Sequence, residues 1–281
     1  MKVFILGNTG MLGNYLYNYY KTKSYNTIAI NRKILDVENI KYNQLENIFK
    51  NYDINENDII INCIGIIKQR NLEDNSKFYK VNSIFPIMLD KYCIENKIKF
   101  IHITTDCIFN GDKGNYIETD LCDVNDDYGL SKYYGEMLNS TIIRTSIIGE
   151  EINNKFSLIE FVKSNKNGNI KGYNNHFWNG LTCLELAKFI EKVIKKDIYW
   201  KGIRHIFSPN FLSKYELCKN ISEIFELNVN IEEYSCETKV DRTLNTVYNK
   251  DILNDIKTIE EQIKELKEYN LTYKIYLDNI L

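Results

Sequence analysis

The chain has 281 residues, of which 44% are hydrophobic and 26% are charged, with two Pro, thirteen Gly, seven Cys and a formal net charge of −2. This composition is that of an ordinary globular protein, and it excludes a disordered chain, a collagen-like fibre and a disulfide-rich miniprotein. A net charge near zero also argues against a dedicated nucleic-acid-binding protein, which usually carries a basic surface.

Short apolar runs alternate with longer, helix-like stretches over the first 150 residues. The strand-like runs are Val3–Leu6, Thr27–Ile30, Ile59–Ile64, Phe100–Thr105 and Ile142–Thr145, and helix-like spacing lies between them near residues 11–21, 43–51, 79–96 and 129–139. Near-continuous apolar strands joined by helical crossovers are typical of a parallel sheet that is covered on both faces. Right-handed crossovers then give an α/β fold with a doubly wound parallel sheet of the Rossmann type.

The alternation weakens after about residue 148. Helical stretches near 155–165, 182–195 and 213–225 and a helical tail from about 257 to 281 are separated by polar loops, and the run Ile203–Phe207 can add one more strand. The sequence therefore predicts a nucleotide-binding domain over residues 1–148, with a return strand near 203–207. A smaller, mostly helical and interleaved substrate-binding cap is expected over residues 149–281.

A glycine-rich segment, Gly7-Asn8-Thr9-Gly10-Met11-Leu12-Gly13, joins the first strand to the first helix. In this position the first glycine permits a tight turn, the second lets the backbone approach a pyrophosphate, and the third lets helix and strand pack closely. The helix N-terminus adds unpaired N–H groups and the positive end of its dipole. We therefore expect residues 7–13 to bind the pyrophosphate of a dinucleotide; a turn without a ligand is the less favoured alternative.

The second strand ends in Asn31-Arg32-Lys33, and no acidic residue follows until Asp36. An acid at this point accepts a hydrogen bond from the ribose 2′-hydroxyl of NAD, whereas a basic residue accommodates the 2′-phosphate of NADP. The sequence therefore predicts NADP(H) in preference to NAD(H), with Asn31 and Arg32 in the cofactor site. The alternative is that Arg32 and Lys33 are solvated surface charges.

Tyr128 and Lys132 lie four residues apart, and so on one face of the predicted helix that follows the fourth strand. The same spacing recurs elsewhere by chance, as in the pairs Tyr19/Lys23 and Tyr215/Lys219. Context distinguishes Tyr128, because it follows a strand that ends in Thr104-Thr105-Asp106, and open α/β sheets bind ligands at strand C-termini.

Reduction of a ketone by a nicotinamide requires a proton at the ketone oxygen, and a tyrosine with a pKa near 10 is a poorly tuned acid at neutral pH. A lysine ammonium about 4 Å away could lower that pKa by about three units. We therefore expect Tyr128 to donate the proton, Lys132 to lower its pKa and Thr105 to hold the oxygen. Otherwise Tyr128 is a packed aromatic residue and Lys132 a surface charge.

Taken together, these motifs resemble an extended short-chain dehydrogenase/reductase of the dTDP-4-dehydrorhamnose reductase type, a nucleotide-sugar family. The matching segments are Gly7-x-x-Gly10-x-x-Gly13, Asn62-Cys63-Ile64-Gly65, Val81-Asn82, Thr104-Thr105-Asp106, Tyr128-x-x-x-Lys132 with Gly135-Glu136, and Arg144-Thr145-Ser146. The resemblance thins beyond residue 150, where Trp178-Asn179-Gly180-Leu181-Thr182 and Arg242-Thr243-Leu244 still look similar.

The resemblance implies a catalytic set of Thr105, Tyr128 and Lys132. It implies a cofactor site made of Gly7, Asn8, Thr9, Gly10, Met11, Leu12, Gly13, Asn31, Arg32, Cys63, Ile64, Gly65, Asn82, Tyr128 and Lys132. The expected substrate site comprises Thr105, Asp106, Cys107, Trp178, Asn179 and Arg242.

The roles of the substrate residues in the cap stay open. Trp178 and Asn179 either contact the sugar or nucleotide or form a purely structural turn before Thr182, which can cap the next helix. Arg242 either grips a substrate diphosphate or forms a structural ion pair.

The pair Asp106-Cys107 departs from the pattern of related nucleotide-sugar 4,6-dehydratases, which carry Asp-Glu at this place, so a dehydratase is disfavoured. A cysteine here resembles the bifunctional 3,5-epimerase/4-reductases. A thiol with a pKa near 8.5 can shuttle a proton beside a ketone, so Cys107 is either a catalytic acid/base for epimerisation or a residue that lines the pocket. His176 and Lys155 are the candidates for a second acid/base.

The resemblance implies NADPH-dependent reduction of a nucleotide-activated 4-keto-6-deoxy-hexose, with or without prior 3-epimerisation. The sugar is expected to be UDP- or dTDP-linked and of the rhamnose type or the 2-acetamido-2,6-dideoxy-L-hexose type. Two rivals are a catalytically silent NADP-binding regulatory subunit of the same fold and an epimerase without net redox change. Thr105, Tyr128 and Lys132 together favour an enzyme over the silent subunit; a homodimer is left open.

Several further features indicate what the protein lacks. No stretch approaches the roughly 20 apolar residues of a membrane span, and the first residues form a strand-like run rather than a signal peptide. The seven cysteines are scattered and never spaced as CxxC, and His102 and His205 fall inside strand-like runs as core residues would. We therefore expect reduced thiols, no metal, no membrane or nucleic-acid partner and a cytoplasmic location.

Overall fold

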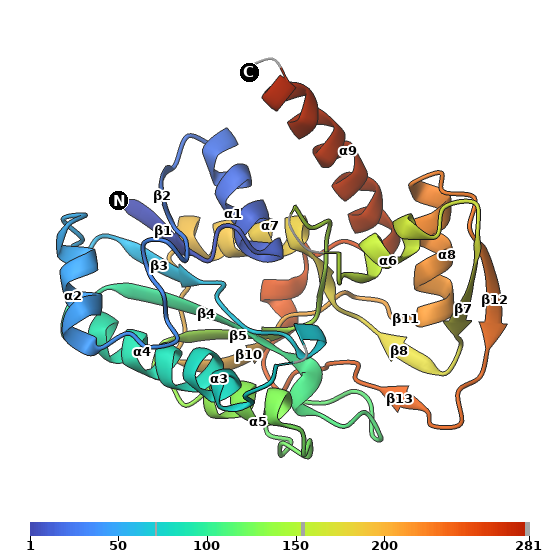
Figure 1. Ribbon diagram of the computed structural model, residues 1–281, viewed down its shortest axis with the longest axis horizontal. Helices are drawn as coiled ribbons and strands as arrows, with labels where there is room; N and C mark the ends of the chain where they lie inside the picture. Colours follow the sequence, from blue (N-terminus) through green and yellow to red (C-terminus); the bar gives the residue numbers. More distant parts are fainter. Residues whose placement is uncertain (71, 153–154, 279–281) are drawn as a thin grey trace.

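A six-stranded, all-parallel sheet lies at the centre of the computed structural model, which describes residues 1–70, 72–152 and 155–278, the last six of them as backbone only (Figure 1). In spatial order its strands are β10 (Gly202–His205), β5 (Thr141–Thr145), β4 (Lys99–Thr105), β3 (Ile59–Asn62), β1 (Lys2–Leu6) and β2 (Asn26–Ile30). The chain moves outward from β1 to β2 and then back across β1 to β3. The predicted doubly wound parallel sheet is thereby confirmed, with its switch point between β1 and β3.

Helices cover both faces of this sheet (Figure 1). One face packs against α1 (Met11–Thr22) and α7 (Cys183–Lys195), and the other against α2 (Tyr42–Lys50) and α4 (Phe85–Glu95). Successive side chains of β1 alternate between the two layers, with Val3 and Ile5 in the first core and Phe4 and Leu6 in the second. Because both faces of the inner strands are buried, these strands are predominantly apolar, which is why they could be recognised in the sequence.

The segment after β3 forms one bent helical run instead of a single regular helix. It consists of α3 (Ser76–Tyr79), a π-helical turn η2 (Lys80–Ile84) and α4, where the sequence predicts one helix over 79–96. The π-helical turn contains Asn82, which is fully buried. Such turns widen a helix locally and are frequent next to functional sites.

The helix α5 (Asp127–Tyr134) is shorter than the predicted 129–139. It begins after Asp126, whose carboxylate accepts a hydrogen bond from the Gly129 N–H at 2.9 Å. It ends at Gly135, where a Cβ atom would lie 1.9 Å from the backbone oxygen of Asn82. Helix α5 is therefore pressed closely against η2, and the chain turns there toward β5.

A smaller lobe lies beside the sheet, at the right of Figure 1. It contains the helices α6 (Leu158–Ser164) and α8 (Lys214–Ile224), a parallel pair of β7 (Asn169–Tyr173) and β12 (Asn230–Tyr234), and a three-stranded sheet of β11 (Leu212–Ser213), β8 (His176–Trp178) and β13 (Val240–Asp241). A further short pair, β6 (Ile147–Ile148) and β9 (Leu181–Thr182), lies where the chain passes between the two lobes. The lobe thus holds more strand than the mostly helical cap that was expected, because these strands are too short and too polar to give a clear pattern.

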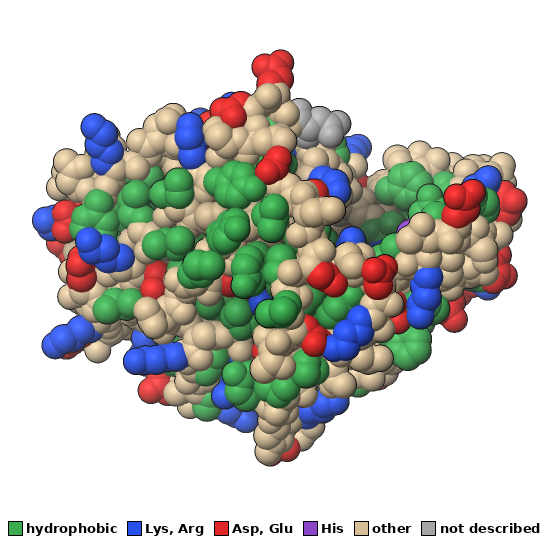
Figure 2. Space-filling view, turned by 90° about the horizontal axis from the view of Figure 1, so that it is seen from below, with side chains coloured by type: hydrophobic (Ala, Val, Ile, Leu, Met, Phe, Trp, Pro, Cys, Tyr) green, Lys and Arg blue, Asp and Glu red, His purple; other side chains and the backbone are tan. Residues whose placement is uncertain are grey.

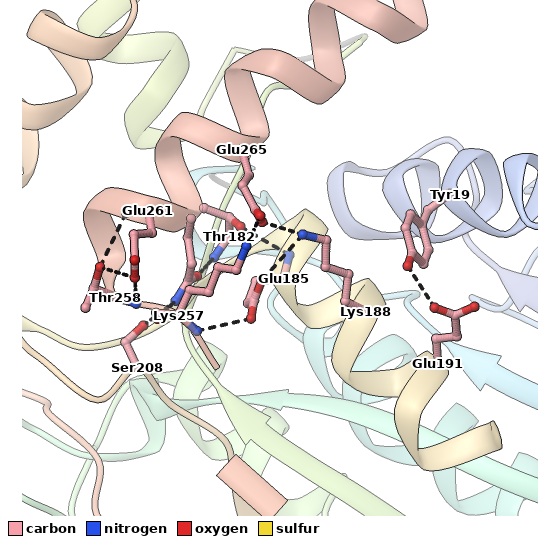
Figure 3. A network of polar contacts seen from close by, with 11 residues as sticks. Tyr19, Thr182, Glu185, Lys188, Glu191, Ser208, Lys257, Thr258, Glu261 and Glu265 are labelled. Atoms are coloured by element: carbon pink, nitrogen blue, oxygen red, sulfur yellow. Dashed lines mark hydrogen bonds and ion pairs between the residues drawn. The ribbon is translucent and has the colours of Figure 1, made fainter. Parts of the chain in front are cut away.

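The two lobes interleave along the chain. Beyond residue 148, α7, β10 and α9 (Ile259–Asp278) all pack with the large lobe or its sheet. Figure 3 shows the contacts of α9, where Lys188 on α7 and Lys257 both point to Glu265 on α9. The same view shows a bond between α1 and α7, in which the Tyr19 hydroxyl donates to Glu191 at 2.7 Å. The tail forms the predicted helix up to residue 278, and residues 279–281 lie outside the described residues.

Segments more than a hundred residues apart meet next to the end of β4. The Tyr116 N–H donates to the Thr243 oxygen at 2.8 Å, and the Asn245 N–H donates to the Tyr116 oxygen at 2.7 Å. The Asp241 N–H donates to the Gly111 oxygen at 2.6 Å. These bonds fasten the stretch that follows β13 to the loop after β4, and so bring Arg242 to the large lobe.

A buried polar cluster supports this junction from inside. Arg144 on β5 donates two hydrogen bonds to Glu136, at 3.0 and 2.5 Å, and a third from Nη1 to His205 Nε2 at 2.8 Å. His205 Nδ1 lies 2.8 Å from the Asn245 oxygen and 3.1 Å from the Tyr116 oxygen. Because both neighbours of Nδ1 are acceptors, the proton resides there and Nε2 accepts from Arg144.

Figure 2 shows the molecule from below, where a hollow separates the large lobe from the smaller one. Within the described residues, no helix combines the length and the hydropathy that crossing a bilayer requires.

Candidate active site

The glycine loop lies at the switch point of the sheet, between the C-terminal ends of β1 and β3. Gly7 has a φ of +81°, a left-handed conformation that favours glycine, and its N–H donates to the Ile30 oxygen at 2.8 Å. A Cβ atom on Gly13 would lie 2.3 Å from the Gly7 oxygen, so the first turn of α1 packs directly on the loop. Gly10 caps α1 without any side-chain hydrogen bond, which leaves N–H groups of the first turn free for a ligand. These features fit the pyrophosphate of a dinucleotide.

One end of the groove is a cavity of about 360 Å³ that adjoins the end of β2. Arg32 lines it, as predicted, but two carboxylates line it as well. Arg32 Nη2 lies 2.5 Å from Glu38 and Nε 3.5 Å from Asp36, while Lys77 Nζ lies 3.8 Å from the other Glu38 oxygen. Glu38 and Lys77 were not found from the sequence, because nothing near them marks a ligand site.

Four of the predicted cofactor residues do not line the groove. Asn8, Gly13, Asn31 and Asn82 lie outside the lining of both cavities, within the part of the chain that is described. Asn82 instead accepts a hydrogen bond from the Ile66 N–H at 2.9 Å and donates to the Ile66 oxygen at 3.0 Å. It is therefore a clamp beneath the loop after β3, and the prediction of direct cofactor contact is corrected to a positioning role.

The other end of the groove is a larger cavity of about 510 Å³ between the two lobes. Gly10, Cys63, Ile64 and Gly65 line both cavities, so the two spaces are continuous. Within it the structure brings together Thr105, Asp106, Cys107, Tyr128 and Lys132 from the end of β4 and the start of α5. A dinucleotide lying along the groove would therefore reach the predicted catalytic residues.

The predicted catalytic side chains converge at the start of α5. The Tyr128 hydroxyl interacts with the Thr105 side chain, and its ring packs edge-on against Phe78 at 6.0 Å between centroids. Lys132 is buried, and its Nζ would lie 2.6 Å from a Cβ atom placed on Gly65. The glycine thus leaves room for the ammonium under the loop after β3, on the floor of the groove.

The electrostatics of this pair correct one expectation. Burial raises the pKa of Tyr128 far above its usual value, with Cys107 and Asp106 adding to the increase, and Lys132 is not among the groups with the largest effect. Burial also lowers the pKa of Lys132 to about 8. Desolvation thus dominates the pKa of Tyr128, and the predicted lowering by Lys132 is not seen in the structure. Tyr128 is held as a neutral phenol, the form that can donate a proton.

Cys107 is less suited to proton transfer than the sequence suggested. Burial, with a contribution from Asp106, raises the pKa of its thiol to about 12. Its Sγ lies 3.6 Å from Asp106 Oδ1, and its N–H donates to Thr105 Oγ1 at 3.2 Å. Its proposed partners do not line the cavity: His176 packs on the Tyr173 ring and contacts the Thr238 oxygen at 3.2 Å, and Lys155 is exposed.

Three of the predicted substrate residues belong to the smaller lobe, and two of these three line the cavity. Trp178 and Arg242 line the cavity, with Arg242 Nε donating to the Phe109 oxygen at 2.7 Å. Asn179 does not line it; its amide exchanges two hydrogen bonds with the backbone of Leu244, at 2.8 and 2.9 Å. The predicted contact between Asn179 and substrate is therefore corrected to a structural one. Lys214, which the sequence analysis missed, lines the same wall.

The remaining histidines are core residues, as expected. His102 is fully buried on β4, its Nδ1 lies 3.1 Å from Asn62 Nδ2, and burial lowers its pKa to about 3. His205 is buried in the cluster with Arg144. Among the described residues, no three His, Cys, Asp or Glu side chains gather as metal ligands would.

The sequence was compared with family models and with known proteins. The family model described as the RmlD substrate binding domain matches residues 1–268. The spore coat polysaccharide biosynthesis protein SpsK of Bacillus subtilis is 28% identical over 251 residues, which cover 84% of this chain and 86% of that protein. A dTDP-4-dehydrorhamnose reductase of Aggregatibacter actinomycetemcomitans is 28% identical over 230 residues, 76% of each chain.

Among solved structures, a dTDP-4-dehydrorhamnose reductase of Bacillus anthracis in complex with NADP superposes with a TM-score of 0.79. The match covers 95% of this chain and 99% of that chain, at 23% identity. The similarity therefore extends over both lobes and the groove between them.

Proposed function

This chain belongs to the RmlD substrate-binding-domain family of extended short-chain dehydrogenases/reductases, and from that membership and the geometry of the groove we propose that it reduces the 4-keto group of a nucleotide-activated 6-deoxy-hexose with NADPH. The observation that carries the proposal is the meeting of Thr105, Tyr128 and Lys132 at the inner end of a dinucleotide-sized groove. The finer assignment, to a rhamnose-type or 2-acetamido sugar on UDP or dTDP, belongs to the same proposal.

The cofactor residues divide along the groove. The first turn of α1 and the loop Gly7–Gly10 would hold the pyrophosphate, and Arg32 with Lys77 would meet the 2′-phosphate of NADP in place of Glu38. Lys132, at the floor beside Gly65, would bind the ribose next to the nicotinamide. When bound, the dihydronicotinamide supplies a hydride for the ketone carbon.

The residues of this chain then handle the proton. The neutral Tyr128 hydroxyl donates a hydrogen bond to the ketone oxygen and gives up its proton as negative charge develops there. Thr105 donates a second hydrogen bond to the same oxygen and keeps it beside the phenol. The ammonium of Lys132 stabilises the phenolate that remains, because an opposite charge nearby favours the ionised form.

A division of labour between the lobes is part of the proposal. Residues 1–148 would bind the cofactor and carry the proton donor, while the cap within 149–281 would bind the nucleotide sugar through Trp178 and Arg242. The bond from Arg242 to the Phe109 oxygen supports this arrangement, since it anchors a cap residue at the edge of the catalytic loop.

Epimerisation is less well supported than reduction. The high pKa of the Cys107 thiol and the placement of His176 and Lys155 outside the cavity lining leave Cys107 without either of its two predicted partners. We propose reduction without 3-epimerisation. Exchange of deuterium from heavy water into the carbon next to the ketone, lost in Cys107→Ala, would contradict this part.

The test of the proposal is Tyr128→Phe, which removes the proton donor and keeps the ring. We expect kcat for NADPH oxidation with a 4-keto-6-deoxy nucleotide sugar to fall by about 10²–10⁴-fold, while the Kd for NADPH stays within about threefold. Tyr134→Phe is the matched control, because Tyr134 lies on the same helix and is 42% exposed.

Two results would overturn the reductase. Full activity in Tyr128→Phe would remove the proposed acid. Wild-type protein that binds NADPH but oxidises none with any 4-keto-6-deoxy sugar on UDP, dTDP or GDP would favour a regulatory subunit of the same fold, and sugar conversion without NADPH consumption would favour an epimerase.

A further inference from the structure

Lys214 occupies a position in the substrate cavity that the proposed reaction does not yet use. It is the first residue of α8, directly after Ser213, whose hydroxyl and backbone form a capping box with Glu216. This cap fixes the start of the helix, and the Lys214 side chain extends over the Trp178 ring, with Nζ 5.3 Å from the ring centroid. Lys214 thereby lines the same cavity as the end of β4.

Two cations on this wall lack a carboxylate partner. Within the described residues, neither Lys214 nor Arg242 forms an ion pair, whereas Lys68 at the same cavity is paired with Asp126 at 3.0 Å. Arg242 donates from Nε and Nη2 to the Phe109 and Asn110 oxygens, at 2.7 and 3.3 Å, which leaves its Nη1 without a bond to this part of the chain. The guanidinium of Arg242 is thus held in place, and its Nη1 can still donate to a ligand.

The buried carboxylate of Asp106 carries one negative charge beside two cations and, within the described residues, forms no ion pair with either of them. Asp106 interacts electrostatically with both Lys214 and Arg242, but its Oδ1 accepts the Thr105 hydroxyl instead, at 3.1 Å. Burial lowers the pKa of Lys214, while the charge of Asp106 acts in the opposite direction. Positive charge withdrawn from water is costly unless an anion compensates for it.

The position of the two cations indicates which anionic group of the ligands they would bind. They share a cavity with Thr105 and Tyr128, so a hexose whose ketone oxygen meets those hydroxyls would present its opposite, phosphorylated end to the smaller lobe. The pyrophosphate of the dinucleotide is accounted for at the far end of the groove, by the loop Gly7–Gly10. Lysine and arginine donors suit phosphate oxygens, the first as a point charge and the second as a planar fork.

We propose that Lys214, together with Arg242, binds the diphosphate of the nucleotide-sugar substrate. The inference rests on the proposed substrate class and adds to it the side chain that recognises the phosphates. Trp178, beneath the ammonium, would keep the lysine stem extended toward the ligand.

The experiment is a binding titration of the protein saturated with NADP⁺, using UDP, dTDP and GDP as probes and calorimetry as the readout. Lys214→Met keeps the length of the stem and removes the charge. We expect the Kd of the best-bound diphosphate to rise by at least about fivefold, as loss of a charge-assisted hydrogen bond implies, with the Kd for NADPH unchanged. Lys214→Arg should recover most of the affinity.

Lys219→Met is the matched control. Lys219 lies on the same helix, its Nζ is 5.3 Å from the Tyr215 ring centroid, and it does not line the cavity, so its Kd values should equal those of the wild type. A loss smaller than fivefold in Lys214→Met, an equal loss in Lys219→Met, or a wild type that binds no diphosphate would overturn the proposal. A protein that binds a diphosphate through Lys214 but oxidises no NADPH contradicts the reductase and leaves this subsite intact.

Discussion

Arg32 lies between two carboxylates at the cofactor end of the groove, so its effect on nucleotide choice depends on which partner it keeps. Its ion pair with Glu38 is at the surface, with Arg32 66% exposed, and such pairs are weak. A 2′-phosphate carries more charge than a carboxylate and can accept from the same guanidinium. Arg32 is therefore free to exchange Glu38 for the phosphate at little cost.

This residue-level argument predicts cofactor selectivity. Arg32→Gln should raise the Kd for NADPH by about tenfold and change the Kd for NADH by less than about twofold, because only NADPH carries the phosphate. Fluorescence titration of both cofactors measures the two constants. Lys33→Gln, a neighbouring cation that does not line the cavity, serves as the control. Equal losses for NADPH and NADH in Arg32→Gln would show that the guanidinium does not read the phosphate.

Single residues also mark how far the sequence could predict the site. Thr105, Tyr128 and Lys132 were predictable because they lie at a strand end and on one helix face, which are local patterns. Lys214 was not predictable, because its neighbours in the cavity lie on β8, after β13 and at the end of β4, and only folding brings these segments together. Asn82 and Asn179 were assigned to ligands from the family resemblance, whereas in the structure both side-chain amides are hydrogen-bonded to the backbone.

At the scale of elements, the glycine loop and α1 are in close contact. The Cβ atom of Gly13→Ala would meet the Gly7 backbone oxygen at 2.3 Å, whereas that of Gly10→Ala would lie 3.3 Å from the same atom. We expect Gly13→Ala to reduce the free energy of unfolding by about 1–3 kcal/mol and to weaken NADPH binding, because helix and loop must separate. Gly10→Ala should change the unfolding free energy by less than about 1 kcal/mol. Urea denaturation of each variant measures the two free energies of unfolding. Equal values would show that the loop moves to accommodate the added methyl group without a cost in stability.

Elements differ in how much of them the sequence predicts. The strands of the central sheet were found within one or two residues because most of their side chains are apolar and the inner strands are buried on both faces. The strands β7 and β12 were missed, since each has only five residues and alternates with polar side chains on an exposed face. The π-helical turn at Lys80–Ile84 leaves no mark on the apolar spacing, so the sequence predicts a plain helix there.

For the whole molecule, the cluster of His205, Arg144 and Glu136 connects β10 to both segments that close the junction between the lobes. Burial, with a contribution from the Arg144 charge, lowers the pKa of His205 to about 4, because a proton on Nε2 would face the guanidinium. The unfolded chain has its histidine pKa near 6.5, so between pH 6.5 and 4 it binds more protons than the folded protein. The free energy of unfolding must therefore fall as the pH is lowered through this window.

The corresponding variant is His205→Gln, which does not titrate and keeps an acceptor for Arg144. From pH 7 to pH 5 its unfolding free energy should decrease by about 2 kcal/mol less than that of the wild type, as measured by urea denaturation at the two pH values. Carboxylates that titrate in the same range cancel in this difference. His176→Gln, at a half-exposed ring, should alter the slope less, and a wild-type slope in His205→Gln would refute the assignment.

The covering of one sheet face by α7 has a consequence for synthesis on the ribosome. The strands β1 to β5 are complete by Thr145, but the layer that shields Val3, Ile5 and their neighbours is completed only when Lys195 has been made. At about 5–20 residues per second, this interval lasts roughly 3–10 s. During that time α1 alone covers this face of the sheet, and the apolar side chains that α7 will cover stay exposed on the nascent chain.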